Sequence, residues 1–397
     1  MESLESASAP LRIEVNQLGP LPAFLTEAPG AVARVTAPTG DKVWLVRDHA
    51  LGRLVLTDDR FSRVAAAGAR APKLVDVQPA PQSMVSMDGP DHARLRRVVA
   101  GAFTGRRAAL LGPSIERLAD EHIGRLIAAG PPADLSGGLA LPLARGVLCS
   151  LLGIPAQDSD CFRDHVEVVF DCTHGTRQEK ARHRVRLVSY MAGLIERRRQ
   201  EPDDDLLTAM IQAHDEDRLS SAELITMGLT LLTAGYETTA GQIGLAALAL
   251  VSDPLAYGQL RRRPELLPAA VEELLRLTPS TPVSLTRVAT QPVRLGGVTV
   301  AAGEAVVVSL LHGNRDESVF AEPRGGTSQS RSVTHLTFGH GAHRCPGAPL
   351  ARLQLQIVLA RLLRHFPSLR LAAGPPQAVA WKEGLFTRGL SRLLVEW

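Results

Sequence analysis

A single cysteine stands in the stretch of this 397-residue sequence that is best suited to chemistry. Cys345 lies in "FGHGAHRCPGAPLAR", between a glycine-rich loop and a helix predicted to start near Pro349. The glycines around the sulfur remove side chains, so backbone can approach something large and flat; they are Gly339, Gly341 and Gly347. Backbone N–H groups and the dipole of a helix that begins here favour a thiolate. The loop therefore predicts a sulfur that is a nucleophile or a metal ligand.

The other cysteines give no sign of a site. Cys149, Cys161 and Cys172 form no CxxC pair, which argues against a zinc ribbon or a dithiol redox motif. We interpret each as a small apolar residue of a helical segment. A disulfide framework is not expected at this chain length and cysteine density.

A carboxylate and a hydroxyl interrupt the long apolar segment 224–251. Glu237 and Thr238 follow Ala234 and Gly235 in the middle of it. The length would suit a membrane span, but a charge at the bilayer centre is costly, so we expect a helix buried in the core. An unpaired buried carboxylate is also costly. A carboxylate next to a hydroxyl in a dry pocket can deliver protons, and the pair predicts that role.

Two pairs of charged residues share a helix face. Glu273 and Arg276 stand three apart in "EELLR", and His92 and Arg96 stand four apart in "GPDHARLRR". Such pairs are common on exposed helices and contribute little energy there. Whether either pair has a role in the protein depends on the helices and loops that surround it.

Helices are expected to make up most of the chain, because helical periodicity dominates for roughly two hundred residues after Pro90. The predicted helices cover 90–103, 114–129, 139–152, 177–200, 222–251, 264–277 and 349–366.

Short β-like runs flank this helical body. "VARVTA" and "VWLV" precede it, and "SLTRVAT", "VRLGGVTV" and "EAVVVSL" follow it, separated by Gly and Pro. The C-terminal "GLFTRGLSRLLVEW" suits a closing hairpin. With no repeat and no clear linker, we expect one domain, 1–397, mainly α with small β-sheets. Its parts would be a β-rich portion at about 30–60, the helical body at about 90–280, small sheets at about 281–310, and the cysteine loop with its helix at about 336–366.

Composition excludes bulk attraction to nucleic acid or to an anionic membrane. The chain has 44 Lys and Arg against 41 Asp and Glu, a net charge of +3. The start, "MESLESASAPLRIEV", has neither a basic nor an apolar leader region, so we expect a cytoplasmic protein.

In their order along the chain, these motifs resemble those of the cytochrome P-450 superfamily, soluble bacterial type. The cysteine stretch resembles its haem-binding loop, "TAGYETT" its oxygen-binding helix and "EELLR" its ExxR motif. The resemblance spans nearly the whole chain. It implies the cytochrome P-450 fold, with haem between the long central helix and the cysteine loop.

The resemblance also implies roles for single residues. Haem b would be bound through iron by the thiolate of Cys345, a ligand that favours cleavage of the O–O bond. Glu237 and Thr238 would be catalytic and relay protons, while Glu273 and Arg276 would be structural. The other residues expected to contact the cofactor are His92, Arg96, Ala234, Gly235, Arg287, Phe338, Gly339, His343, Gly347 and Ala348.

The resemblance also implies which atoms of the cofactor and which ligand some of these residues contact. The haem propionates would accept hydrogen bonds from His92, Arg96, Arg287 and His343. Gly235 would leave room for dioxygen beside the helix.

The chain departs from the family pattern after "NRDESVF", where the usual Pro-x-x-Phe-type element is incomplete. The third partner of the Glu273–Arg276 pair is therefore left open between Arg331 and His335.

The implied activity is a monooxygenase that hydroxylates or epoxidises a lipophilic substrate of specialised metabolism, either free or bound to a carrier protein. Electrons would come from a ferredoxin and its reductase, because the chain has no GxGxxG segment for a flavin or nicotinamide. The segments expected to line the pocket are mostly apolar. Single residues expected there are Val85, Val283, Leu285 and Phe386.

Three alternatives remain open at this point. The same haem chemistry could form a C–C or C–O bond by oxidative coupling, which only the mass of the product separates from oxygen insertion. A peroxide-driven enzyme is a further variant, against which Glu237 and Thr238 argue. A non-catalytic haem-fold partner protein belongs to another class, and the intact cysteine and acid–alcohol pair argue against it.

Overall fold

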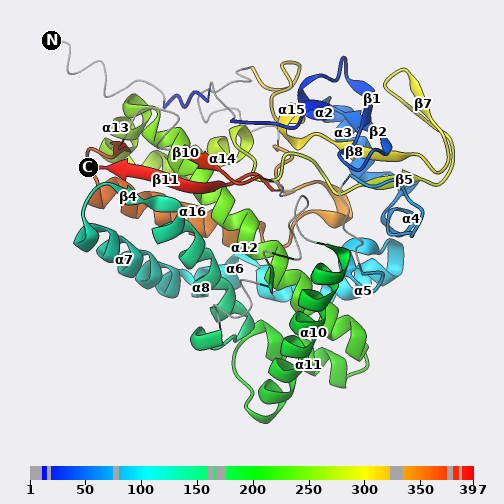
Figure 1. Cartoon of the computed structure of the whole chain (residues 1–397), viewed down its shortest axis with the longest axis horizontal. Coiled ribbons are helices and arrows are strands. Elements are labelled where there is room, and N and C mark those ends of the chain that lie inside the picture. Colours follow the sequence, from blue (N-terminus) through cyan, green and yellow to red (C-terminus); the bar gives the residue numbers. More distant parts are fainter. Residues whose placement is uncertain are drawn as a thin grey trace.

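Helices dominate the protein (Figure 1). The sheet that contains Val32–Thr36 lies at one end of the molecule, and the sheet that contains Leu390–Glu396 lies toward the opposite end. The computed structural model describes residues 11–15, 19–74, 80–158, 165–166, 168, 176–321, 334–372, 379–383 and 387–397. Over these residues the expected mainly α architecture is confirmed.

Helix α12, Ser221–Val251, runs through the middle of the molecule (Figure 1). It begins at a capping box, in which the Ser220 hydroxyl accepts from the Glu223 N–H at 3.2 Å and the Glu223 carboxylate accepts from the Ser220 N–H at 2.8 Å. Most of its residues are buried. No single helix of the described residues has the length and apolar character to cross a membrane. Only α12 and α13, Pro254–Arg262, taken together across a 99° bend, meet that measure.

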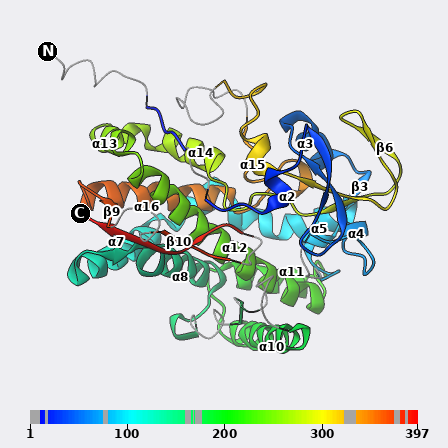
Figure 2. The ribbon, with the colours of Figure 1, turned by 45° about the horizontal axis from the view of Figure 1, so that its top comes forward.

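The other long helices pack around α12. Helices α10 and α11 lie on one side of it, and α13 and α14 lie on the opposite side in both views (Figures 1 and 2). The bounds are α5 Gly89–Ala100, α6 Gly105–Leu110, α7 Gly112–Ala129, α8 Leu141–Leu152, α10 Arg177–Gln200, α11 Leu206–Asp215, α14 Leu267–Leu277 and α16 Ala348–His365.

Every predicted helix is confirmed, with small shifts at the ends. Two of them include 3₁₀ turns, η2 Gly101–Phe103 after α5 and η5 Pro264–Leu266 before α14. Helices α6, α11, α13 and α3, His49–Thr57, are not predicted. Shorter helical pieces are α2 Ala23–Thr26, α4 Arg63–Ala66, η1 Met84–Ser86, η3 Ser136–Ala140, η4 Ala156–Asp158, α15 Leu310–Gly313 and η6 Gly341–His343.

The larger sheet joins residues from the N-terminal part of the sequence with residues 287–308, in the strand order β1-β2-β8-β5-β3. Strands β1, Val32–Thr36, and β2, Lys42–Val46, form an antiparallel hairpin, and β2 pairs in parallel with β8, Ala305–Val308. Strands β5, Arg287–Ala289, and β3, Phe61–Ser62, complete the sheet. Predicted strand runs from both sides of the helical body therefore meet in this sheet, whereas "VRLGGVTV" does not join it.

The C-terminal strand builds the second sheet. Strand β11, Leu390–Glu396, pairs with β10, Val379–Trp381, so the closing hairpin starts earlier in the chain than "GLFTRGLSRLLVEW" predicts. On its other edge β11 pairs with β4, Ala133–Asp134. It also pairs with β9, Arg370–Leu371, through Val395 and Glu396. A separate hairpin consists of β6 Val293–Leu295 and β7 Val298–Val300.

Candidate active site

Two glycines shape the cysteine loop. Gly339 and Gly341 have φ angles of +70° and +72°, a region that favours glycine. A Cβ on Gly341 would lie 2.8 Å from the carbonyl oxygen of Leu56, so only glycine lets the loop approach α3 this closely. The Cys345 N–H then donates to the Phe338 carbonyl at 2.8 Å. These constraints place the cysteine directly before α16.

Cys345 combines exposure with a position deep in the protein. Its side chain is exposed, and yet burial in the surrounding protein raises the pKa of the thiol. The backbone N–H groups of Gly347 and Ala348 donate to the sulfur, and together with the charges of Arg96 and Arg344 they act to lower the same pKa. A metal cation in front of the sulfur would complete this effect, because a coordinating thiol is deprotonated outright.

A cationic cluster lies near the cysteine loop. Its members are Arg63, His92, Arg287 and His343. The rings of His92 and His343 lie 4.1 Å apart, and His343 Nε2 is 3.7 Å from the Asp88 carboxylate. Both arginines are almost fully buried, at 3% and 5% exposed, and donate to backbone carbonyls.

The two buried arginines of this cluster lie close to the Asp88 carboxylate, and the charge of the exposed Asp59 also acts on Arg287. Burial, His92 and the nearby arginines lower the pKa of His343 to about 3, and burial with the Arg287 charge lowers the pKa of Arg63 to about 10. Burial acts to raise the pKa of Asp88, but hydrogen bonds from the Ser62 hydroxyl and from backbone N–H groups outweigh it and leave that pKa lowered. A ligand that brings its own carboxylates would relieve the repulsion within the cluster, as haem propionates would.

The Glu273–Arg276 pair anchors the cysteine loop from α14. Arg276 Nε donates to the Glu273 carboxylate at 2.8 Å, and Arg276 Nη1 donates to the Asn314 carbonyl at 2.7 Å. The Asn314 side chain in turn accepts from the Leu336 N–H at 2.6 Å. A chain of hydrogen bonds therefore runs from the pair to the start of the loop.

His335 is not the third partner of that pair. Its Nε2 lies 3.3 Å from the carboxylate of Glu272, the residue before Glu273, which also accepts from Arg352 of α16 at 2.6 Å. The prediction for His335 is wrong because Glu272, rather than Glu273, points toward it. Arg331, the other candidate, lies outside the described residues.

The polar turn of α12 holds two groups that could handle protons. Glu237 is 9% exposed, and its carboxylate accepts from Lys382 Nζ at 2.8 and 3.1 Å. The Thr238 hydroxyl donates to the carbonyl of Ala234 at 2.6 Å. Ala234 itself is exposed, although most of α12 is buried, so open space lies against this turn.

Gly235 serves helix packing rather than space for dioxygen. A Cβ there would lie 2.6 Å from Leu148 Cδ2 of α8, so glycine allows α12 and α8 to pack closely. The expectation for this residue is corrected, because its missing side chain points to α8. Ala234 is the exposed small residue of the turn.

The residues expected in the substrate pocket differ in exposure. Leu285 is 44% exposed and Val85 is half-buried. Val283 is only 2% exposed and packs in the apolar cluster of the larger sheet, which leaves it no face toward an open pocket. Phe386 lies outside the described residues.

Three residues of the site are not marked by any motif of the sequence: Arg63, Asp88 and Lys382. No local pattern marks the first two, whose partners come from distant segments. Lys382 carries one weak signal, since it is one of only four lysines in an arginine-rich chain.

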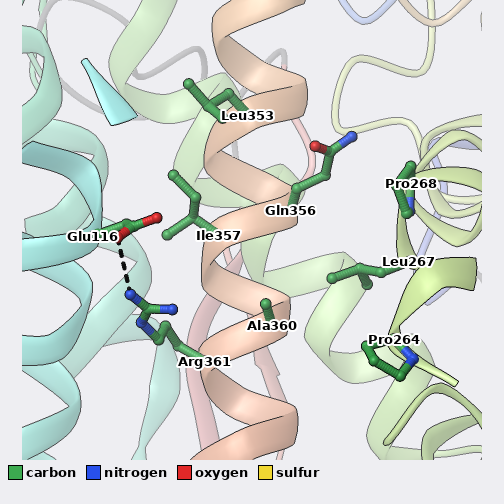
Figure 3. A pocket seen from close by; sticks show the side chains of 9 residues that line it. All are labelled: Glu116, Pro264, Leu267, Pro268, Leu353, Gln356, Ile357, Ala360 and Arg361. Atoms are coloured by element: carbon green, nitrogen blue, oxygen red, sulfur yellow. Dashed lines mark hydrogen bonds and ion pairs between the residues drawn. The ribbon is translucent and has the colours of Figure 1, made fainter. Parts of the chain in front are cut away.

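A separate hollow of about 240 Å³ lies between α7, α14 and α16 (Figure 3). Its two charged groups pair with each other, Arg361 Nη2 with the Glu116 carboxylate at 3.1 Å. Cys345 is not among its lining residues, so it is no part of the site above.

The fold and the site define a haem-thiolate protein. A family model for cytochrome P-450 matches residues 161–380, and the chain belongs to this family. Nocardicin C N-oxygenase of Nocardia uniformis subsp. tsuyamanensis is 44% identical over 366 residues, 92% of each chain. Mycinamicin IV hydroxylase/epoxidase of Micromonospora griseorubida is 40% identical over 368 residues, again 92% of each chain. A solved cytochrome P-450 with biaryl coupling reactivity superposes with a TM-score of 0.87 at 35% identity, covering 94% of this chain and 95% of that one.

Proposed function

We propose that this cytochrome P-450 inserts one oxygen atom of dioxygen into a lipophilic specialised metabolite, and that residues 1–397 act as one domain. The observation that carries the proposal is the exposed sulfur of Cys345, set inside the protein beside a cationic cluster. Two relatives are a hydroxylase/epoxidase of mycinamicin IV and an N-oxygenase of nocardicin C. The activities of these two relatives favour oxygen insertion over other uses of the fold.

Cys345 would hold the cofactor as the thiolate ligand of iron. When bound in this way, haem supplies the activation of dioxygen. His92, Arg287, His343 and Arg63 would bind its propionates, and the added carboxylates would relieve the repulsion within the cluster. Arg96 would be a further donor to the propionates. Its Nη2 donates to the Arg344 carbonyl at 2.5 Å, and this bond holds Arg96 next to the cysteine loop.

Glu237 and Thr238 would deliver protons from α12. Both side chains stand on the turn at which Ala234 borders open space. The Thr238 hydroxyl already bonds within its own helix at 2.6 Å, so it can donate outward only by rotating away from the Ala234 carbonyl. Substrate would lie against the same space and contact Leu285, the most exposed of the described residues that are predicted to line the pocket.

Electrons would come from a reduced ferredoxin supplied by its reductase. Arg97 and Arg344, on α5 and in the cysteine loop, are exposed and could meet an acidic partner. Arg96 is less suited, because it is half-buried and bonded to the loop. Such donors act in the cytoplasm, which is the location that we propose.

Oxidative coupling is the second candidate, favoured by the likeness to a cytochrome P-450 with biaryl coupling reactivity. The mass of the product decides between the two. A gain of one oxygen supports the proposal, whereas a loss of two hydrogens supports coupling. A non-catalytic role is disfavoured because Cys345, Glu237 and Thr238 are all present.

An optical titration of the purified ferric protein tests the proposal. A panel of macrolides, terpenoids and aromatic peptide-derived metabolites would be added, free and bound to a carrier protein. We expect a shift of the haem band from low to high spin with one class, followed by a product that has gained oxygen. A protein that shows no haem band after haem is supplied during expression would overturn the proposal.

A further inference from the structure

The carboxylate of Glu237 is tied to a residue that no motif of the sequence marks. Lys382, the residue after β10, places Nζ 2.8 Å from one oxygen of Glu237 and 3.1 Å from the other. The two side chains are only 11% and 17% exposed. Exposed ion pairs contribute little energy, but a shielded pair leaves a costly unpaired charge when one partner is removed.

Close backbone packing lets Lys382 reach this far. Its N–H donates to the Gly389 carbonyl at 3.0 Å, at the start of β11. A Cβ on Gly389 would lie 3.5 Å from Gly241 Cα and 3.7 Å from Lys382 Cδ. A Cβ on Gly241 would lie 2.5 Å from the Arg388 carbonyl oxygen. The two glycines therefore bring the strand against α12, and the lysine stem crosses that contact to the carboxylate.

The ion pair with Lys382 also occupies both carboxylate oxygens of Glu237. Both of its oxygens accept from one ammonium group, and Thr238 bonds to Ala234 instead of to Glu237. Among the residues that the structure describes, Lys382 is the one cation paired with Glu237. In the part of the chain that the structure describes, the carboxylate is thus held by the residue next to β10 and has no hydrogen bond to Thr238.

We propose that Lys382 is a positioning residue for the oxygenase reaction: it holds the Glu237 carboxylate in a resting position, from which the carboxylate swings to pass a proton toward Thr238. The inference rests on the proposed function and adds a partner to it. The proton enters from solvent at the partly exposed lysine end, and the carboxylate is restored when the proton moves on. Lys382 then takes the carboxylate back.

The test compares Lys382→Met, Lys382→Arg, Glu237→Gln and the double variant Glu237→Gln/Lys382→Met in haem-loaded protein. Lys42→Met on the remote strand β2 is the matched control, because Lys42 bonds only the Thr36 hydroxyl among the described residues. One readout is the fraction of ferredoxin electrons recovered in product. A second readout, independent of turnover, is guanidinium unfolding of the ferric proteins, analysed as a double-mutant cycle.

We expect Glu237→Gln to lower coupled product formation about 100-fold. Lys382→Met should lower it about tenfold, as does loss of other groups that orient a reactive side chain, and Lys382→Arg should restore it to within about threefold. The double variant should match Glu237→Gln alone. In unfolding, the two single changes should be non-additive by about a factor of ten in the equilibrium constant.

Distinct results would overturn the two proposals. Fully coupled turnover in Glu237→Gln would remove the proton relay and with it this part of the proposed function. Normal coupling in Lys382→Met beside an impaired Glu237→Gln would overturn only the role of Lys382, as would equal losses in Lys382→Met and Lys382→Arg. If Lys382→Met fails to load haem, Lys382→Gln replaces it, and equal coupling in Lys382→Gln and Lys382→Arg overturns the proposal.

Discussion

The cysteine side of the site and the α12 side are held in different ways. On the cysteine side, hydrogen bonds run from Arg276 through Asn314 to the loop, mostly to backbone groups in buried surroundings. On the α12 side, Thr238 bonds within its own helix and Glu237 is held by one long side chain from another segment. A metal ligand needs a fixed position, whereas a proton carrier needs partners that it can exchange. The two arrangements fit these two needs.

The largest effect is expected from Cys345→Ala, on the cysteine side of the site. The variant should lose the haem-thiolate spectrum of the reduced carbon monoxide complex completely, together with turnover, because Cys345 is the one cysteine of the loop and only a thiolate gives this spectrum. The reduced carbon monoxide spectrum measures this. Cys149→Ala is the control, since Cys149 is buried in α8 and should leave the spectrum unchanged. A thiolate-type spectrum that persists in Cys345→Ala would show that the ligand is another residue.

Arg276→Met should give the next largest effect. It leaves the Glu273 carboxylate, which is 11% exposed, without its partner, and we expect a loss of about 3–5 kcal/mol in the free energy of unfolding. Guanidinium unfolding and haem content measure it. The double variant Glu273→Gln/Arg276→Met should recover part of the loss, because no charge is then left unpaired. Unchanged stability in Arg276→Met would mean that the cysteine side does not depend on this pair.

Thr238→Ala should impair proton delivery on the α12 side of the site, with little change in the free energy of unfolding. Haem content and substrate binding should be kept, while the fraction of electrons recovered in product falls by about tenfold and peroxide appears instead. Thr230→Ala is a matched control, because the Thr230 hydroxyl also bonds within α12, to the Thr226 carbonyl at 2.7 Å. Full coupling in Thr238→Ala would contradict the relay.

The smallest effect concerns the pH dependence of stability, at His312, two residues before Asn314. Burial and then the charges of Arg47 and Arg315 lower the pKa of His312 to about 4, from an ordinary value of 6.5. Between these values the unfolded chain binds a proton that the folded protein does not bind, so stability falls as the pH falls from 6.5 toward 4. The loss should be on the order of 1 kcal/mol after solvent screening. His312→Gln should flatten unfolding curves in this window, and an equal pH dependence would contradict the assignment.

Local patterns carry most of what could be predicted. The cysteine loop, the acid–alcohol pair and the ExxR motif each lie within a few residues, and the structure shows their helices where periodicity predicts them. Helix α3 is missed because its nine residues lie in a stretch whose neighbours favour strands. Val283 and Leu285 look alike in sequence, and only the packing of the larger sheet buries the first and exposes the second. Lys382 could not be found because its role depends on contact with a helix far away in the chain.

The parallel pairing of β2 with β8 has a consequence for synthesis on the ribosome. The hairpin β1–β2 emerges first, and the edge of β2 must wait for most of the chain before Ala305–Val308 is made. Gly341, which packs against the end of α3, emerges later still. The cysteine loop can therefore pack in its final position only when the chain is almost complete. A nascent chain stalled before β8 would carry an open strand edge and no place for the cofactor, which makes such fragments prone to aggregate.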